Sequence, residues 1–307
     1  MSLTGQPLAW AIFGVVVAGM LALDLGVFHR KAHVVRGREA AIWSVVWIAL
    51  SLTFNLGIYL VSGSNRGLEF FQAWLIEKAL SVDNLFVFLA AFSYFAVPEE
   101  LQHRVLFWGI LGALVTRGAF IAVGAALLAT FHWVTYIFGA FLLLTGGRLL
   151  FGGDDEVHPE SNPVLKLFRR FVRTTSDYEG PHFFLRRDGR LWATPLLMVL
   201  VVIEASDVVF AVDSIPAVFG VTRDVFIVYT SNIFAVLGLR ALCFLVARLV
   251  RRLRYLKPAL ALVLAFVGAK MLIGDKVHIS DLISLGVVAG LILAAALLSL
   301  LIPPAEK

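Results

Sequence analysis

Charged residues are scarce in this sequence and cysteine is almost absent. Only 15% of its 307 residues are charged, 60% are hydrophobic, and the mean hydropathy is +0.89. Soluble domains are about 25% charged, so the composition excludes an ordinary soluble domain. The single cysteine, Cys243, excludes both a disulfide framework and a thiolate cage for a metal. The chain is therefore expected to lie in a membrane.

Long apolar runs dominate what is present. A helix needs about 20 apolar residues to cross a bilayer. The sequence predicts nine such spans, at about 8–28, 39–61, 69–96, 105–128, 131–151, 194–216, 224–247, 258–273 and 280–302. The expected fold is an all-α membrane protein, a polytopic bundle of about nine transmembrane helices within one integral membrane domain, 1–307. The polar segment 152–193 is expected to be a cytoplasmic loop that packs weakly or is mobile.

The basic residues predict the orientation. Lys and Arg gather in segments 29–38, 152–193 and 248–257, and short loops rich in these residues stay on the cytoplasmic side. This places the N-terminus outside and the C-terminus in the cytoplasm, with the bacterial inner membrane as the expected location. The pI near 9.5 then reflects topology, with the lipid bilayer rather than nucleic acid as the partner of these loops.

Two units of three spans, about 69–151 and about 195–274, carry similar polar residues in the same order. The matched positions are Glu77 with Asp207, Asp83 with Asp213, Asn84 with Ser214, Arg117 with Arg240, and Gly146-Gly147-Arg148 with Gly268-Ala269-Lys270. Because three is an odd number, the second unit must enter the membrane from the opposite side. Such inverted repeats are typical of secondary transporters, whose site lies near the midplane. Duplication for packing alone remains the alternative.

Six acids lie within the predicted spans: Asp24, Glu77, Asp83, Glu204, Asp207 and Asp213. Each ionised group at the membrane centre costs about 2.5–3.5 kcal/mol, so these groups are expected to face the bundle interior and to have partners. The natural charge partners are Arg117 and Arg240, since a guanidinium group binds a carboxylate with two parallel hydrogen bonds. We expect Pro216 to break its helix and to bring Asp213 into line with the other acids.

The polar side chains gathered in this way offer only oxygen ligands. No histidine lies at the core of a predicted span, and there is no second cysteine. Oxygen ligands suit Mg²⁺, Ca²⁺ and Mn²⁺ and do not separate them from one another. Three interpretations of the acids stay open: a divalent-cation site, a path for protons or an organic solute, and purely structural ion pairs.

Three sequence elements carry a resemblance to a known family: LDLGVFHRK at 23–31, EKALSVDNLFVF at 77–88 and DVVFAVDSIPAVF at 207–219. Together they resemble the TerC/Alx family of bacterial integral membrane proteins, over about residues 8–302. The resemblance implies a role in manganese homeostasis as an exporter of Mn²⁺, and a link to tellurite resistance. The positions expected to handle the metal are Glu77, Asp83, Asn84, Glu204, Asp207 and Asp213, with Asp24 and Ser214 ranked lower.

The function expected from these observations is Mn²⁺ efflux across the inner membrane. One alternative is a membrane scaffold of a tellurite-resistance or metalation complex, with protein partners at segment 152–193. Another is a small-solute exporter. The sequence shows no pair of nucleophile and base and no phosphate-binding glycine loop, so an enzyme is not expected. No resident cofactor is expected either, because Mn²⁺ is the cargo.

Overall fold

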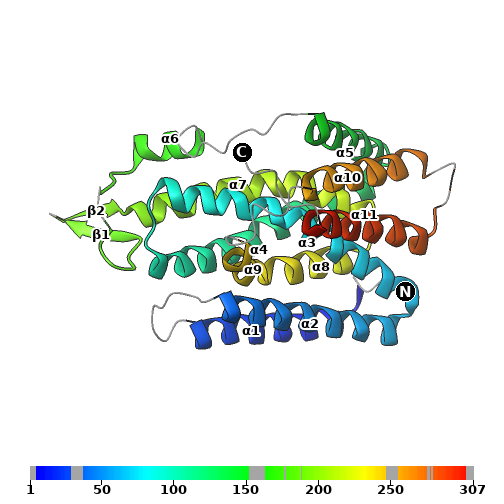
Figure 1. Cartoon of the computed structure of the whole chain (residues 1–307), viewed down its shortest axis with the longest axis horizontal. Helices are drawn as coiled ribbons and strands as arrows, with labels where there is room; N and C mark the ends of the chain where they lie inside the picture. The colour runs from blue at the N-terminus through cyan, green and yellow to red at the C-terminus, as the bar shows by residue number, and fades with distance from the viewer. Residues whose placement is uncertain are drawn as a thin grey trace.

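The computed structural model describes residues 5–28, 37–151, 163–175, 178–187, 189–246, 255–274, 277 and 279–301. Its elements in chain order are α1 (Pro7–Phe28), α2 (Gly37–Ser62), α3 (Ser64–Tyr94), α4 (Glu99–Thr130), α5 (Val134–Phe151), α6 (Pro163–Phe171), β1 (Phe184–Arg187), β2 (Arg190–Ala193), α7 (Pro195–Phe219), α8 (Val225–Leu237), α9 (Leu239–Val246), α10 (Leu256–Ile273) and α11 (Asp281–Leu301). Figure 1 shows the long helices lying roughly side by side, with the hairpin of β1 and β2 at one end.

Among the described residues, seven helical stretches are long and apolar enough to cross a membrane: α2, α4, α5, α7, Val225–Leu245 across α8 and α9, α10, and Asp281–Ser299 in α11. All nine predicted spans coincide with helices, but two are not among these seven. In α1 the side chains are described only as far as Ala22, and the stretch Pro7–Ala22 is too short to count. Helix α3 has 31 residues, among them five charged ones, because it carries much of the polar interior. The spans at α1 and α3 therefore stay predictions.

The centre of the bundle is formed by α3, α4, α7 and α8, in which α3 and α4 each pack against both α7 and α8. The span over α8 and α9 has 83% of its residues buried, whereas α2, α5 and α11 have only 22%. The peripheral helices consequently present large apolar side chains outward. Examples are Val61 on α2, Leu144 on α5 and Leu282 on α11, which are 83%, 74% and 67% exposed. Exposure of so much apolar surface to water would be unfavourable, so these faces suit contact with lipid.

One expectation about an individual span is wrong: Pro216 does not break its helix, since α7 runs on to Phe219. The predicted span 224–247 is one apolar stretch, as expected, but it is divided into α8 and α9 at Gly238. At this junction the Lys78 Nζ of α3 donates a hydrogen bond to the Ala235 carbonyl oxygen over 3.0 Å. A Cβ atom on Gly238 would lie only 2.9 Å from that Nζ, so the glycine makes room for the lysine.

The described part of segment 152–193 is packed rather than loose, which corrects the expectation of weak packing, and it adds one two-stranded hairpin to an otherwise helical fold. In the hairpin Phe184 pairs with Ala193 in an antiparallel register. The turn includes Gly189 with a φ of 71°, a backbone conformation that favours glycine. Leu165 of α6 is buried in a cluster with Leu196 of α7. Residues 152–162, including Asp154-Asp155-Glu156, lie outside the described residues.

Tyr178 ties this segment to the end of α3. Its hydroxyl donates a hydrogen bond to the Phe95 carbonyl oxygen over 2.8 Å, and burial raises the pKa of Tyr178 to about 12. The hydroxyl therefore keeps its proton, and with it this contact, throughout the physiological pH range. The Thr194 hydroxyl makes a second tie by donating to the His182 carbonyl oxygen over 2.7 Å. The described part of segment 152–193 is thus held at one end of the bundle.

Candidate functional site

Arg117 of α4 joins two of the predicted acids at the centre of the bundle. Its Nη2 donates to Asp207 Oδ1 over 2.9 Å and its Nε to Asp207 Oδ2 over 3.2 Å. Its Nη1 binds Glu77 Oε1 and also donates to Asn232 Oδ1 over 3.2 Å. All four residues are at most 4% exposed. The ion pairs connect α4 with α3 and α7, so one guanidinium group holds an acid from each predicted repeat.

A cavity of about 150 Å³ lies beside this cluster. It is lined by Glu77, Leu80, Ser81 and Asn84 of α3, Arg117 of α4, Thr145 and Leu149 of α5, Phe210, Asp213 and Ser214 of α7, and Leu264 of α10. On α3 the lining positions follow the helical spacing i, i+3, i+4 and i+7, and on α7 they follow i, i+3 and i+4, so each set occupies one face. Both predicted repeats contribute to the wall.

Three buried polar groups on the cavity wall have no hydrogen-bond partner among the described residues. They are Glu77 Oε2, Asn84 Nδ2 and Ser214 Oγ, and their residues are only 1–2% exposed. A buried polar group without a partner costs about 1–3 kcal/mol. Groups of this kind gathered around one cavity indicate that a polar or charged ligand satisfies them.

The predicted site residues divide between two faces of α7. Asp213, half-buried, joins the cavity with Ser214 and lies near Thr145 and Arg148. Asp207 is held by Arg117 next to the cavity. Glu204 points instead toward α4, where a Cβ atom on Gly112 would lie 1.9 Å from its Oε1. The structure thus brings Glu77, Asn84, Asp213 and Ser214 together, and it leaves Glu204 apart from them.

Two acids of the predicted set cannot be placed. Asp24 belongs to α1 and Asp83 to α3, but their side chains lie outside the described residues. Arg240, the predicted partner of the second repeat, is buried in α9. Within the described residues, no group of three or more His, Cys, Asp or Glu side chains lies close enough to hold a metal ion. A cation in the cavity would therefore need neutral oxygen ligands as well as carboxylates.

Sequence reasoning missed two residues of the site. Asn232 of α8 binds Arg117, and Thr145 of α5 lines the cavity. For Asn232 a signal was present, because Thr230, Ser231 and Asn232 form a polar run inside an apolar span. Both hydroxyls bond to carbonyl oxygens of their own helix, which leaves the asparagine side chain to reach across. Thr145 gave no comparable signal.

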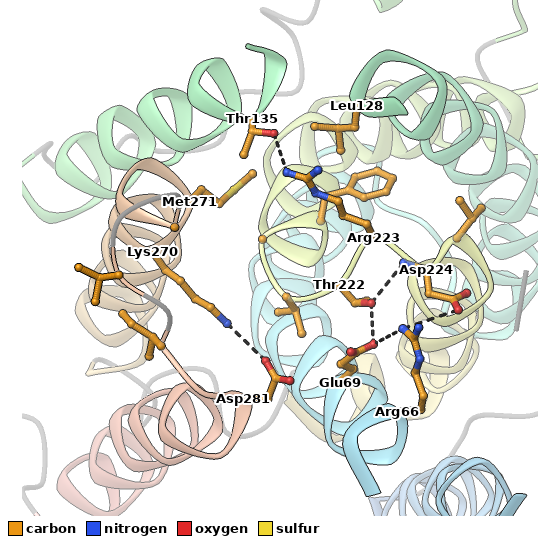
Figure 2. A pocket seen from close by; sticks show the side chains of 17 residues that line it. Arg66, Glu69, Leu128, Thr135, Thr222, Arg223, Asp224, Lys270, Met271 and Asp281 are labelled. Carbon is orange, nitrogen blue, oxygen red and sulfur yellow. Dashed lines mark hydrogen bonds and ion pairs between the residues drawn. The ribbon is translucent and has the colours of Figure 1, made fainter. Parts of the chain in front are cut away.

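A second, larger pocket of about 720 Å³ opens farther along the same helices. Figure 2 shows its charged residues, which are Arg66, Glu69, Arg223, Asp224, Lys270 and Asp281. Glu69 Oε2 accepts hydrogen bonds from the Thr222 hydroxyl over 2.6 Å and from Arg66 Nη1 over 2.8 Å. Lys270 pairs with Asp281 over 3.6 Å. We call this pocket the vestibule.

The vestibule and the central cavity share α3, α4, α5, α7 and α10 as walls. Between them lie apolar positions on three of these helices. Ala73 of α3, Ala217 of α7 and Val267 of α10 are each 0–1% exposed. The two spaces thus lie along the same helices, with buried apolar residues between them on each of these three helices.

Comparison with known proteins agrees with the sequence elements noted above. The model of the "Integral membrane protein TerC family" matches residues 62–307. The chain belongs to the TerC family. It is accordingly a multi-pass integral membrane protein.

Relatives from several bacteria resemble almost the whole chain. "Uncharacterized membrane protein STKORF319" of Myxococcus xanthus is 52% identical over 297 residues, which cover 97% of this chain and 93% of that protein. "Putative membrane-bound redox modulator Alx" of Escherichia coli (strain K12) is 50% identical over 301 residues, covering 95% and 94%. An "Uncharacterized membrane protein" of Rickettsia bellii is 40% identical over 286 residues, covering 93% and 95%. No solved structure matches the chain.

Proposed function

We propose that this TerC family member exports divalent cations, in particular Mn²⁺, and that the central cavity is its cation site. The observation that carries the proposal is the set of unpartnered buried groups on Glu77, Asn84 and Ser214 facing one cavity beside Asp213. Carboxylate, amide and hydroxyl oxygens are ligands that Mn²⁺ accepts. The amide of Asn84 can turn to present its oxygen, since the two orientations are nearly indistinguishable in structures.

The modest number of carboxylates suits transport. A transported ion must bind well enough to enter its site and weakly enough to leave it. Two acids, Glu77 and Asp213, together with neutral oxygens offer less charge than a permanent metal site does. Asp207 does not add to this set while Arg117 holds it.

The size of the cavity favours an ion over an organic solute. Pockets for drug-sized ligands typically measure about 300–1,000 Å³, and this cavity measures about 150 Å³. A water molecule takes about 30 Å³ in the liquid, so a cation with a few waters would fit. The small-solute exporter is therefore the weaker interpretation.

The packing of the bundle supports an inverted repeat. Helix α4 contacts α7 as α8 contacts α3, while α3 packs on α7 and α5 on α10. Gly139 meets Gly268 and Gly146 meets Ala261, which makes α5 and α10 antiparallel. These are the contacts expected if a two-fold axis in the membrane plane exchanges 69–151 with 195–274. If α1 and α3 also span the membrane, nine spans result. The vestibule would then face the outside and the hairpin would face the cytoplasm.

Flux through vesicles tests the proposal. Purified protein in lipid vesicles should carry radioactive Mn²⁺, and Asp213→Asn or Glu77→Gln should lower the rate by about tenfold or more, as expected when a charged ligand is lost. Glu100→Gln, an exposed acid at the start of α4, is the matched control and should keep the wild-type rate. Flux that is absent from folded wild-type protein, or unaffected by both cavity variants, contradicts the proposal.

A scaffold function is the second candidate, and exposed apolar residues at one end of the bundle favour it. Phe184 and Leu191 of the hairpin are 50% and 64% exposed, and Leu167 of α6 is 57% exposed. The name of the E. coli relative suggests redox modulation. Direct thiol–disulfide exchange does not suit this chain, because its one cysteine, Cys243, is buried. If Leu191→Ser abolished the cellular phenotype of the protein while Mn²⁺ flux in vesicles stayed intact, the scaffold function would be supported.

A further inference from the structure

Glu77 is shared between a fixed cation and the central cavity. Its Oε1 binds Arg117 Nη1, while its Oε2 has no partner among the described residues and lies in a residue that lines the cavity. Arg117 itself is completely buried and also lines that cavity. A cation bound at Oε2 and the guanidinium group at Oε1 would thus share one carboxylate.

The charges in this cluster do not balance. Glu77 and Asp207 supply two negative charges and Arg117 one positive charge. A guanidinium group keeps its charge under all physiological conditions. A divalent cation arriving at Glu77 would be attracted by the uncompensated carboxylate and repelled by Arg117, and such interactions are strong in a buried site. The cation and the arginine therefore compete for Glu77.

We propose that Arg117 is an internal counter-ion that takes over Glu77 whenever the transported cation leaves. This inference rests on the proposed function and assigns a positioning residue to it. Two buried carboxylates from different repeats would resist the rearrangement that reorients the site if no cation neutralised them. Arg117 cancels one of their two negative charges from within, which lowers the cost of the return without cargo. By linkage, Arg117 weakens the binding of the cation to Glu77 by the same factor by which the cation weakens the binding of Arg117 to Glu77.

The proposal separates two kinds of transport. Exchange of Mn²⁺ for Mn²⁺ needs only the loaded carrier, whereas net efflux also needs the return without cargo. In vesicles, Arg117→Gln should keep exchange and lower net efflux by about tenfold, and the same variant should bind Mn²⁺ about tenfold more tightly, equivalent to about 1.4 kcal/mol. Arg117→Lys retains a positive charge and should restore part of the net efflux. Arg186→Gln, exposed on the hairpin, is the matched control.

Each outcome of these measurements either supports or contradicts the counter-ion role of Arg117. Equal losses of exchange and net efflux with unchanged Mn²⁺ affinity, or no change in any of the three, would show that Arg117 only supports the fold. If Arg117→Gln does not give monodisperse protein, the double variant Arg117→Gln with Asp207→Asn removes one charge of each sign, and the same measurements apply. Wild-type protein that neither binds nor exchanges Mn²⁺ would instead overturn the proposed function itself.

Discussion

At the scale of single residues, the buried acids are tolerated because specific partners surround them. Asp207 has a guanidinium group across both oxygens, and Glu77 has one on a single oxygen. Among the described residues Glu204 has no guanidinium partner, and its carboxylate lies against Gly112, where the missing side chain provides the space. Glu204 is therefore positioned by shape rather than by an ion pair, and a very small change can move it.

Gly112→Ala tests whether the position of Glu204 matters for transport. The added Cβ would lie 1.9 Å from Glu204 Oε1, and the carboxylate, as the end of a flexible side chain, must move. We expect Mn²⁺ flux in vesicles to fall severalfold while the melting temperature changes little, because alanine suits a helix better than glycine. Gly147→Ala, which meets nothing within 4 Å, should leave both quantities unchanged. Wild-type flux in Gly112→Ala would place Glu204 outside the cation path.

At the scale of helices, small residues set how closely α5 and α10 approach. A Cβ atom on Gly268 would lie 2.7 Å from the Gly139 carbonyl oxygen, and one on Gly146 would lie 2.7 Å from the Ala261 carbonyl oxygen. Backbone atoms cannot move aside as the end of a side chain can. Close packing of this kind through small residues is a main source of helix association in membranes, and here it joins the third helix of each predicted repeat.

Gly268→Ala should therefore destabilise the protein. The new methyl group must force α5 and α10 apart, and overpacking of this kind typically costs about 1–3 kcal/mol. Thermal unfolding in detergent should show a lowered midpoint. Gly286→Ala on α11 is the matched control, because nothing lies within 4 Å of that position, and its midpoint should stay at or above that of the wild type. Equal midpoints for the two variants would mean that the contact between α5 and α10 adjusts to the added methyl group.

At the scale of the whole molecule, polar features mark both ends of the bundle. The hairpin and α6 lie at one end, and the C-terminal end of α10 and the start of α11 lie at the other (Figure 1). Charged residues of the vestibule gather at this second end (Figure 2). The basic segments predict that the hairpin end faces the cytoplasm. The orientation is therefore open to direct chemical measurement.

Thiol labelling measures this orientation. In a Cys243→Ala background, Val277→Cys and Phe184→Cys each place one thiol at an exposed position, at opposite ends of the bundle. A membrane-impermeant maleimide added to intact cells should label Val277→Cys, and it should label Phe184→Cys only after the membrane is opened. The reverse pattern would invert the topology and make the vestibule a cytoplasmic entrance.

The sequence by itself determined that this is a helical membrane protein, and it identified the family. Apolar runs of about 20 residues predict spanning helices because the bilayer leaves backbone groups no other partners, and every predicted span is helical. Glu77 and Asn84, seven residues apart, line the same cavity from one face of α3, since helical periodicity is local. The acids within the spans also identified Arg117 as their partner, because a charge buried in a membrane requires one.

Only the tertiary structure decided which polar groups share a space. Asp213 reaches the cavity from an unbroken α7, because the cavity covers a wide arc of that helix between α3 and α5. Glu204, one helical turn from Asp207, faces α4 instead. The polar segment after α5 forms α6 and a hairpin that pack on helix ends far away in the sequence. Periodicity fixes the face of each helix, but how helices cross and pack depends on contacts that no local pattern encodes.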